Sequence, residues 1–133
     1  MADVNDDVRE ILRNIPGDSH WEGSFWERLA EHCVWDVDAF WMLHRSLVRL
    51  ACAAAGARMD RNMALAIARL QGRVLGLLAA HHNVNDVFRI RNLDADLLRG
   101  MVERFEHAVL GCFSGEVLPE SSYGVRNPLI AER

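Results

Sequence analysis

Hydrophobic residues recur with a helical period in five separate segments of this 133-residue chain. The first segment, Val4 to about Asn14, begins with several Asp and Asn residues, where carboxylates favour the helix dipole. Pro16-Gly17 ends the segment, because proline cannot continue a helix. The stripe that we predict to be buried consists of Val8, Ile11, Leu12 and Ile15.

The second and third segments follow each other closely. Ser24 and Glu27 fit a capping box, in which the serine side chain binds the Glu27 amide and the carboxylate reaches back. This pattern predicts a helix that continues to about Val34. The third helix should begin near Asp36 or Asp38. It should end at Gly56, in a left-handed cap. Its predicted inward face consists of Val37, Phe40, Trp41, His44, Leu47, Val48, Ala51 and Ala55.

Four tryptophans gather around these two segments. Trp26 and Trp41 lie on apolar stripes, so we predict that both belong to the core. Trp21 and Trp35 lie in junctions between segments. For these two, a core position and an interface position both stay open.

The fourth segment carries a heptad pattern behind a predicted cap at Asp60. A seam of this length usually packs inside a bundle, which we favour, and a homodimeric coiled coil is the alternative. Gly72 and Gly76 lie one turn apart and each weakens a helix by roughly 1 kcal/mol, which predicts the close approach of another helix. The seam consists of Met63, Ile67, Leu70, Val74, Leu77 and His81.

The fifth helix should begin after Asn92 or Asp94 and end at Gly115. A turn around Asn85-Asp86 and an irregular or single-turn stretch lead into it. The tail from about Glu116 has little periodicity and should wrap the surface or be partly disordered. The residues predicted to face inward are Leu97, Leu98, Met101, Phe105, Ala108, Val109 and Cys112.

These elements predict an all-α protein, a single compact bundle of about five helices with an irregular C-terminal tail. One domain suits 133 residues, half of which are apolar. The first seven residues are acidic, unlike a signal peptide, and no uninterrupted apolar run approaches the ~20 residues of a membrane span. We therefore expect a cytoplasmic protein that needs no cofactor and no membrane.

The charge of the chain indicates the class of its binding partner, and its cysteine content indicates the redox state of its thiols. Nineteen carboxylates against fifteen arginines give a net charge of -4. The sequence has no basic block interleaved with aromatic residues, which is the pattern that would suggest direct nucleic-acid binding. An acidic excess suits a basic protein partner. Cys33, Cys52 and Cys112 are odd in number and lie in apolar stretches, as reduced, buried thiols do.

No catalytic or metal-binding motif is present in the sequence. Glu103 and His107 lie one helical turn apart, but two ligands do not make a metal site. His81-His82 before Asp86 allows an alternative, a metal-dependent or nucleolytic enzyme that also uses His107. A histidine at a helix end is more simply explained by the helix dipole, so we predict that the protein is not an enzyme.

One pattern of residues lies in the second half of the chain: Asn85-Asp86-x-Phe88-x-Ile90-x-Asn92, Leu97, Glu103-Arg104-Phe105 and Gly111-x-Phe113-Ser114-Gly115 with Pro119 beyond it. This pattern resembles a known family, immunity protein 41 of bacterial polymorphic toxin systems, which includes immunity proteins of contact-dependent growth inhibition. Arg13-Asn14-x-Pro16 and Trp21-x-x-x-Phe25-Trp26 are also similar to it. Between Val37 and Ala80 the likeness lies only in the helical pattern.

The resemblance implies a small cytosolic protein that binds and neutralises a cognate toxin domain, often a nuclease, without an active site of its own. Complementary charge between acidic side chains and a basic toxin would speed association. We expect a monomer. The alternative is a homodimeric adaptor or secretion chaperone that pairs through the heptad seam. The side chains predicted to be exposed and to contact the partner are Asp86, Asp94, Asp96, Glu103, Glu116, Glu120 and Tyr123.

Overall fold

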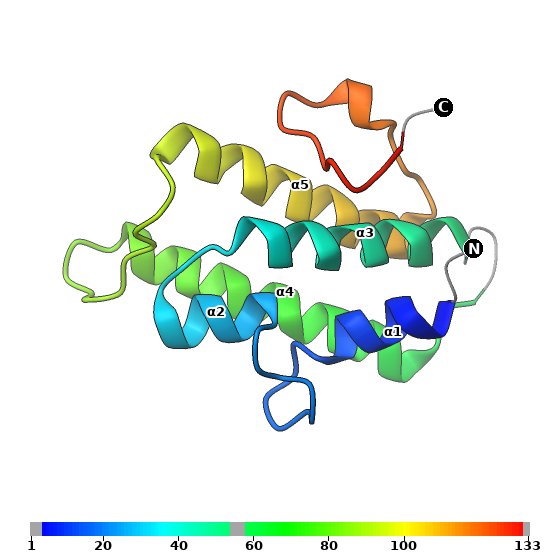
Figure 1. The fold of residues 1–133 in the computed structure, drawn as a ribbon, viewed down its shortest axis with the longest axis horizontal. Coiled ribbons are helices and arrows are strands. Elements are labelled where there is room, and N and C mark those ends of the chain that lie inside the picture. The colour runs from blue at the N-terminus through cyan, green and yellow to red at the C-terminus, as the bar shows by residue number, and fades with distance from the viewer. Residues whose placement is uncertain (1–3, 54–57, 132–133) are drawn as a thin grey trace.

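The computed structural model describes residues 4–53 and 58–131, and within them the protein is an all-α bundle without strands. In Figure 1, α3 runs across the middle, α1 and α2 lie below it, α4 passes behind α1 and α2, and α5 lies above with the C-terminal tail over its end. The elements are α1 (Val4–Leu12), α2 (Phe25–His32), α3 (Val37–Ala53), α4 (Arg61–His82), α5 (Ala95–Ser114) and the short 3-10 helix η1 (Glu120–Ser122).

Aromatic side chains form the centre of the core. The ring of Phe25 lies 4.7 Å from that of Trp35 and 5.3 Å from that of Phe40, both edge to face, which suits the ring quadrupoles. Trp35 is fully buried, so the junction tryptophan whose position the sequence left open belongs to the core. Trp26 and Trp41 are buried as predicted, and Trp21 packs partly buried against the same cluster.

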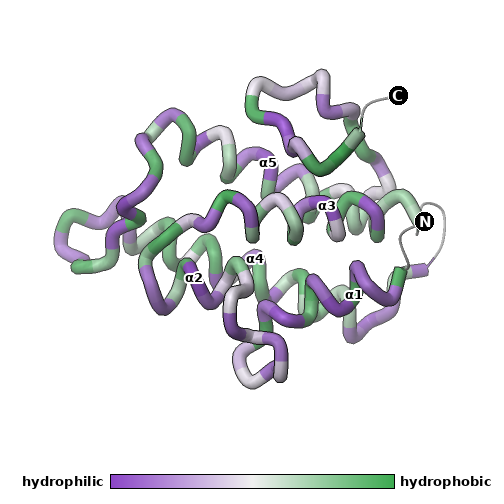
Figure 2. Tube along the Cα trace, in the orientation of Figure 1, coloured by the Kyte–Doolittle hydropathy of each residue, from purple (hydrophilic) through white to green (hydrophobic). Residues whose placement is uncertain are grey.

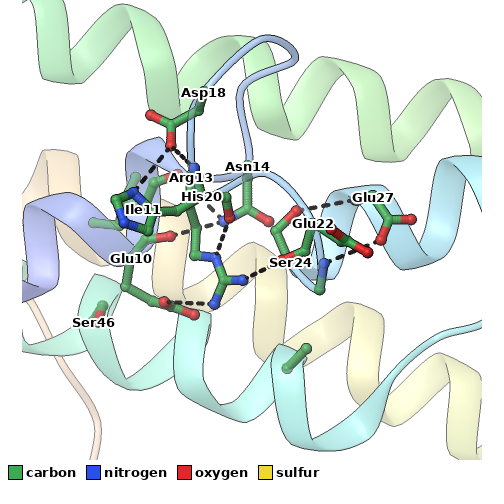
Figure 3. Close-up of polar contacts among 12 residues, drawn as sticks. Glu10, Ile11, Arg13, Asn14, Asp18, His20, Glu22, Ser24, Glu27 and Ser46 are labelled. Atoms are coloured by element: carbon green, nitrogen blue, oxygen red, sulfur yellow. Dashed lines mark hydrogen bonds and ion pairs between the residues drawn. The ribbon is translucent and has the colours of Figure 1, made fainter.

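Asn14 and Arg13 hold the connection between α1 and α2 (Figure 3). The buried Asn14 amide donates to the Glu10 carbonyl at 2.9 Å, and its oxygen accepts from the Trp26 backbone N–H at 2.9 Å. One side chain thereby satisfies the end of α1 and the beginning of α2. The Arg13 guanidinium donates to the backbone oxygens of His20 and Glu22 and folds the loop back on α1.

Most of the predicted helix ends are confirmed. The side chains of Ser24, Asp60 and Asp94 each accept a backbone N–H three residues later, as N-caps do. The Glu27 carboxylate of the capping box reaches the Gly23 amide. Gly115 ends α5 with φ +77°. The predicted cap at Gly56 lies outside the described residues.

Helix α4 turns its heptad seam into the protein. Met63, Ile67, Leu70 and Val74 are buried and Leu77 is half-buried, so this seam is part of the core of the bundle. Within the described residues, no helix of this chain packs on the two α4 glycines. Both glycines are exposed, and a Cβ added at either one would meet nothing within 4 Å.

Four other predicted positions also differ from the structure. Ile15 is 37% exposed because α1 ends three residues before it, and Leu97 is 36% exposed in the first turn of α5, ahead of the packed part of the helix. Cys52 is exposed and Cys33 is half-buried, whereas Cys112 is buried as predicted. Cys33 ends α2 in a left-handed conformation with φ +58°.

Candidate functional site

The exposed side of α5 changes character along its length. Its outward residues lie three and four positions apart, on one stripe of the helix. The first part of the stripe is charged and its end is apolar, which marks the C-terminal end of α5 as the place to look for a binding surface. The stripe consists of Asp96, Arg99, Glu103, Glu106, Leu110 and Phe113.

The apolar end of this stripe continues into the tail. Leu110 is 60% exposed, Phe113 53%, Val117 39% and Leu118 55%. Together with the exposed Glu116, these residues form what we call the α5–tail surface. Large hydrophobic groups that are exposed singly are ordinary, but a contiguous group is a mark of an interaction site.

Two hollows open beside the α5–tail surface. One has a volume of about 370 Å³ and lies between α3, α5 and the tail, with Leu110, Val117 and Leu118 on its wall. The second, of about 410 Å³, shares Val48, Val117 and Leu118 with the first. The tail segment at Val117 and Leu118 therefore separates two concave spaces that are partly apolar, into which side chains of a partner can fit.

A buried network beneath this surface fixes the tail. The Arg104 guanidinium of α5 forms two hydrogen bonds with the Glu120 carboxylate of η1, at 2.9 and 2.6 Å, and a third with the Val125 carbonyl at 2.8 Å. Glu120 also accepts the Asn127 backbone N–H at 2.6 Å. Such bidentate, charge-assisted contacts are strong and directional. We call Arg104, Glu120, Asn127 and His44 the polar latch.

His44 joins the polar latch to α3 and is held neutral. Burial and the nearby Arg104 charge lower the pKa of His44 from 6.5 to about 4. Its two ring nitrogens lie 3.1 Å from a guanidinium nitrogen of Arg104 and 2.9 Å from the amide nitrogen of Asn127. Because both neighbours are donors, a protonated ring would place N–H against N–H on both sides.

Glu120 and Tyr123, which the sequence predicted to be exposed contacts, are buried, with 5% and 8% of their surface exposed. Burial opposes ionisation of Glu120, but hydrogen bonds from Arg104 and Asn127 hold its pKa below the usual value. Tyr123 lies under the Arg104 guanidinium at 3.7 Å, its hydroxyl is 2.8 Å from His107 Nδ1, and burial raises its pKa. Both residues therefore support the surface from below.

The other predicted contacts do not gather at one place. Asp94 and Asp96 lie at the start of α5 and Glu116 lies beyond its end, ~30 Å away at 1.5 Å per residue. Asp94 is occupied as the helix cap, and the half-buried Asp86 accepts the Phe88 backbone N–H at 2.9 Å. Of the predicted contacts, Glu116 alone is part of the α5–tail surface, and Glu103 lies on the stripe that leads to it.

The histidines of the enzymatic alternative have structural partners. His81 Nδ1 lies 3.0 Å from the Ile90 backbone N–H and holds the turn after α4. Burial, His82 and Arg89 lower the pKa of His81, which favours the neutral ring that this contact needs. His107 contacts Tyr123 in the tail instead. Among the residues that the structure describes, no cluster of three or more His, Cys, Asp or Glu side chains could hold a metal ion.

Sequence reasoning missed the residues that define this surface. The predicted partner contacts include neither Leu110 nor Phe113, and Phe113 appears only in the pattern that carries the family resemblance. The signal was nevertheless present, because Leu110 and Phe113 continue the spacing of Glu103 and Glu106 and fall outside the buried stripe. The latch residues Arg104 and His44 have no comparable signal, since their partners are distant in the sequence.

Comparison with known proteins provides no relative, since no family model, curated protein or solved structure matches the chain. Many of the residues that carry the family resemblance have structural roles here. Asn92 exchanges two hydrogen bonds with the Trp35 backbone, at 3.0 and 2.8 Å, and ties the start of α5 to the α2–α3 junction. At Gly111, a Cβ would lie 3.0 Å from the Glu116 carbonyl, so glycine lets the tail turn back closely.

Proposed function

We propose that this protein is an immunity protein that binds and neutralises a cognate toxin domain by protein–protein contact, without catalysis. The observation that carries this proposal is the α5–tail surface, where Leu110 lines one of the two hollows and Phe113 is exposed one turn further along α5. Aromatic and aliphatic anchors at a concave centre are typical of the energetic core of specific interfaces. The resemblance to immunity protein 41 gives the class of partner.

The charges around this surface favour a basic toxin. Glu103, Glu106 and Glu116 are exposed along the approach to Leu110 and Phe113, and the chain carries a net charge of -4. Nuclease domains commonly present basic surfaces to bind nucleic acid. Complementary charge would speed the encounter, and the apolar centre would then slow dissociation. The site of action would be the cytoplasm, where a delivered nuclease meets its substrate.

The polar latch supports this function by preparing the surface before binding. The tail contributes Glu116, Val117 and Leu118, and the buried Arg104–Glu120 pair fixes the tail on α3 and α5. A surface that is ordered in the free protein loses little conformational entropy on association. We therefore expect tight binding without a change of fold.

The direct test is co-expression with the toxin domain of the large secreted protein encoded next to this chain. The proposal expects a complex that survives purification, together with rescue of growth in cells that express the toxin. A wild-type chain that is soluble and folded but neither binds nor rescues would overturn the proposed function.

A pair of matched variants locates the surface. Leu110→Arg places a cation at the centre of the α5–tail surface and should weaken toxin binding by roughly 100-fold or more, as loss of a central anchor does. Val84→Arg makes the same kind of change at a side chain that is 86% exposed in the turn before α5, and binding should remain. Equal losses in both variants would contradict the assigned surface.

A further inference from the structure

Helix α4 is apolar on the side that faces away from the core as well as on the side that faces it. Its 22 residues include no Asp or Glu and three Arg, and Figure 2 shows hydrophobic residues along its length. By length and composition it is the one described helix that could cross a membrane, yet only a third of its apolar window is buried. A helix that is apolar all round is normally covered on both sides.

The uncovered side of α4 has a regular spacing of its own. Leu65 is 46% exposed and Leu75 44%, and the stripe that they share alternates by three and four residues. This is a second heptad seam, opposite the buried one. All six of its residues are exposed: Leu65, Ala68, Gly72, Leu75, Ala79 and His82.

Nothing within the described part of the protein explains glycine on this seam. A Cβ at Gly72 or Gly76 would meet no atom within 4 Å, although each glycine costs a helix roughly 1 kcal/mol relative to alanine. Glycine on an exposed helix face allows another backbone to approach closely from outside. The open space at Gly72 therefore fits a helix that comes from outside this chain.

We propose that α4 pairs with α4 of a second copy of this chain in an antiparallel dimer. In this register Leu75 of each copy lies opposite Gly72 of the other, Ala68 lies opposite Ala79, and Leu65 lies opposite His82. Leu75 thus fills the open space at Gly72 on both sides of the two-fold axis, the small Ala68 and Ala79 let the backbones come close, and the larger Leu65 and His82 meet at the two ends of the contact. A two-fold interface must be complementary to itself, and this seam is.

Charge agrees with the antiparallel direction. Arg61 at the start of one helix comes beside the end of the other, where the turn carries Asp86. Arg69 lies on the flank of the seam opposite Gly76 of the second copy, so like charges do not face each other. Opposed helix dipoles also favour this arrangement over a parallel one.

The area of the seam predicts a weak dimer. A 22-residue helix is ~33 Å long and ~10 Å wide, so the two copies together contribute ~700 Å² of contact. Stable specific dimers bury ~1,200 Å² or more. We therefore expect reversible association that grows with concentration. It leaves the α5–tail surface free, because no α4 residue lines either of its hollows.

Sedimentation of the full chain tests the dimer. The average mass should rise with concentration from 15.1 kDa towards twice that value. Leu75→Glu should keep the chain at 15.1 kDa over the same range, whereas Met42→Glu, at a residue of α3 that is 39% exposed, should leave the association unchanged. A wild-type chain that stays at 15.1 kDa, or an equal loss in both variants, overturns the proposal.

Cross-linking tests the register, independently of the stability of Leu75→Glu. In a Cys52→Ser background, Ala68→Cys mixed with Ala79→Cys should form at least ~10-fold more disulfide-linked dimer than either variant alone, because these positions meet across the antiparallel seam. Self-linking of Ala68→Cys to the same extent would overturn the direction. A monomeric chain that instead co-sediments with anionic lipid vesicles would overturn the second copy as the occupant.

Discussion

The two ends of α5 use the same kinds of residue for different purposes. At its beginning, Asp94 caps the helix and Asn92 fastens it to Trp35, so the polar side chains there close local structure. In its second half, the polar latch is buried beneath the helix, and Leu110 and Phe113 are the large apolar side chains on the surface. A carboxylate near a helix end is therefore a poor guide to a binding site, and exposed apolar groups over a rigid support are a better one.

Among these variants, Arg104→Met should cause the largest loss of stability, because it breaks the buried contact between α5 and the tail. It removes one partner of a buried ion pair and leaves the Glu120 carboxylate without a counter-charge, which typically costs 3–5 kcal/mol. Urea unfolding of the wild type and the variant measures the loss. Arg99→Met, on the exposed stripe of the same helix, should change the free energy of unfolding by less than about 0.5 kcal/mol. Similar values for the two variants would show that the latch is not a stabilising unit.

Acid should weaken the same end of the molecule. The folded-state pKa of His44 is about 4 against 6.5 for the free side chain, so the unfolded chain binds more protons between these values. The free energy of unfolding should therefore fall as the pH drops from 6.5 to 4, by up to about 3 kcal/mol at pH 4. Glu120, whose folded-state pKa is lowered, adds a loss as its carboxylate takes up a proton.

A non-titrating variant separates the contribution of His44 from the rest. His44→Gln should flatten the dependence of stability on pH between 4 and 6.5, even if the variant is less stable at neutral pH. Urea unfolding at several pH values provides both curves. An unchanged slope in His44→Gln would assign the acid sensitivity to other groups.

The affinity for the toxin should depend on side chains at the end of α5 and not on those before its beginning. Phe113→Ala removes an aromatic anchor that is 53% exposed and should cost about 2 kcal/mol, a loss of roughly 30-fold in affinity. Val87→Ala truncates a side chain that is 95% exposed in the turn before α5 and should change affinity less than about twofold. Titration calorimetry with the purified toxin domain gives both values. The reverse pattern would place the interface at the beginning of the helix.

Patterns between neighbouring residues made most of the helices predictable. The features that could not be predicted depend on contacts between residues far apart in the sequence. The caps at Ser24, Asp60 and Asp94 bind amides three residues away, so their spacing reveals them. The bond between Arg104 and Glu120 joins residues that are 16 positions apart and lies under a tail without periodicity, so the sequence predicted Glu120 to be exposed. The sequence did not reveal the candidate site because a buried ion pair holds the tail in place. The hydrophobic pattern predicts that charged residues are exposed.

Asp94→Ala has the smallest expected effect. It tests whether the Asp94 carboxylate serves as a helix cap or as a contact for the toxin. Loss of the bond from the Asp94 carboxylate to the Leu97 amide should reduce the free energy of unfolding by about 1 kcal/mol. Asp96→Ala removes a neighbouring charge in the same first turn and should cost only a few tenths of a kcal/mol through the helix dipole. Toxin affinity should stay within about twofold in both variants, because neither side chain is part of the α5–tail surface. Weaker binding by Asp94→Ala without a loss of stability would instead make this carboxylate a contact, and the acidic beginning of α5 would join the interface.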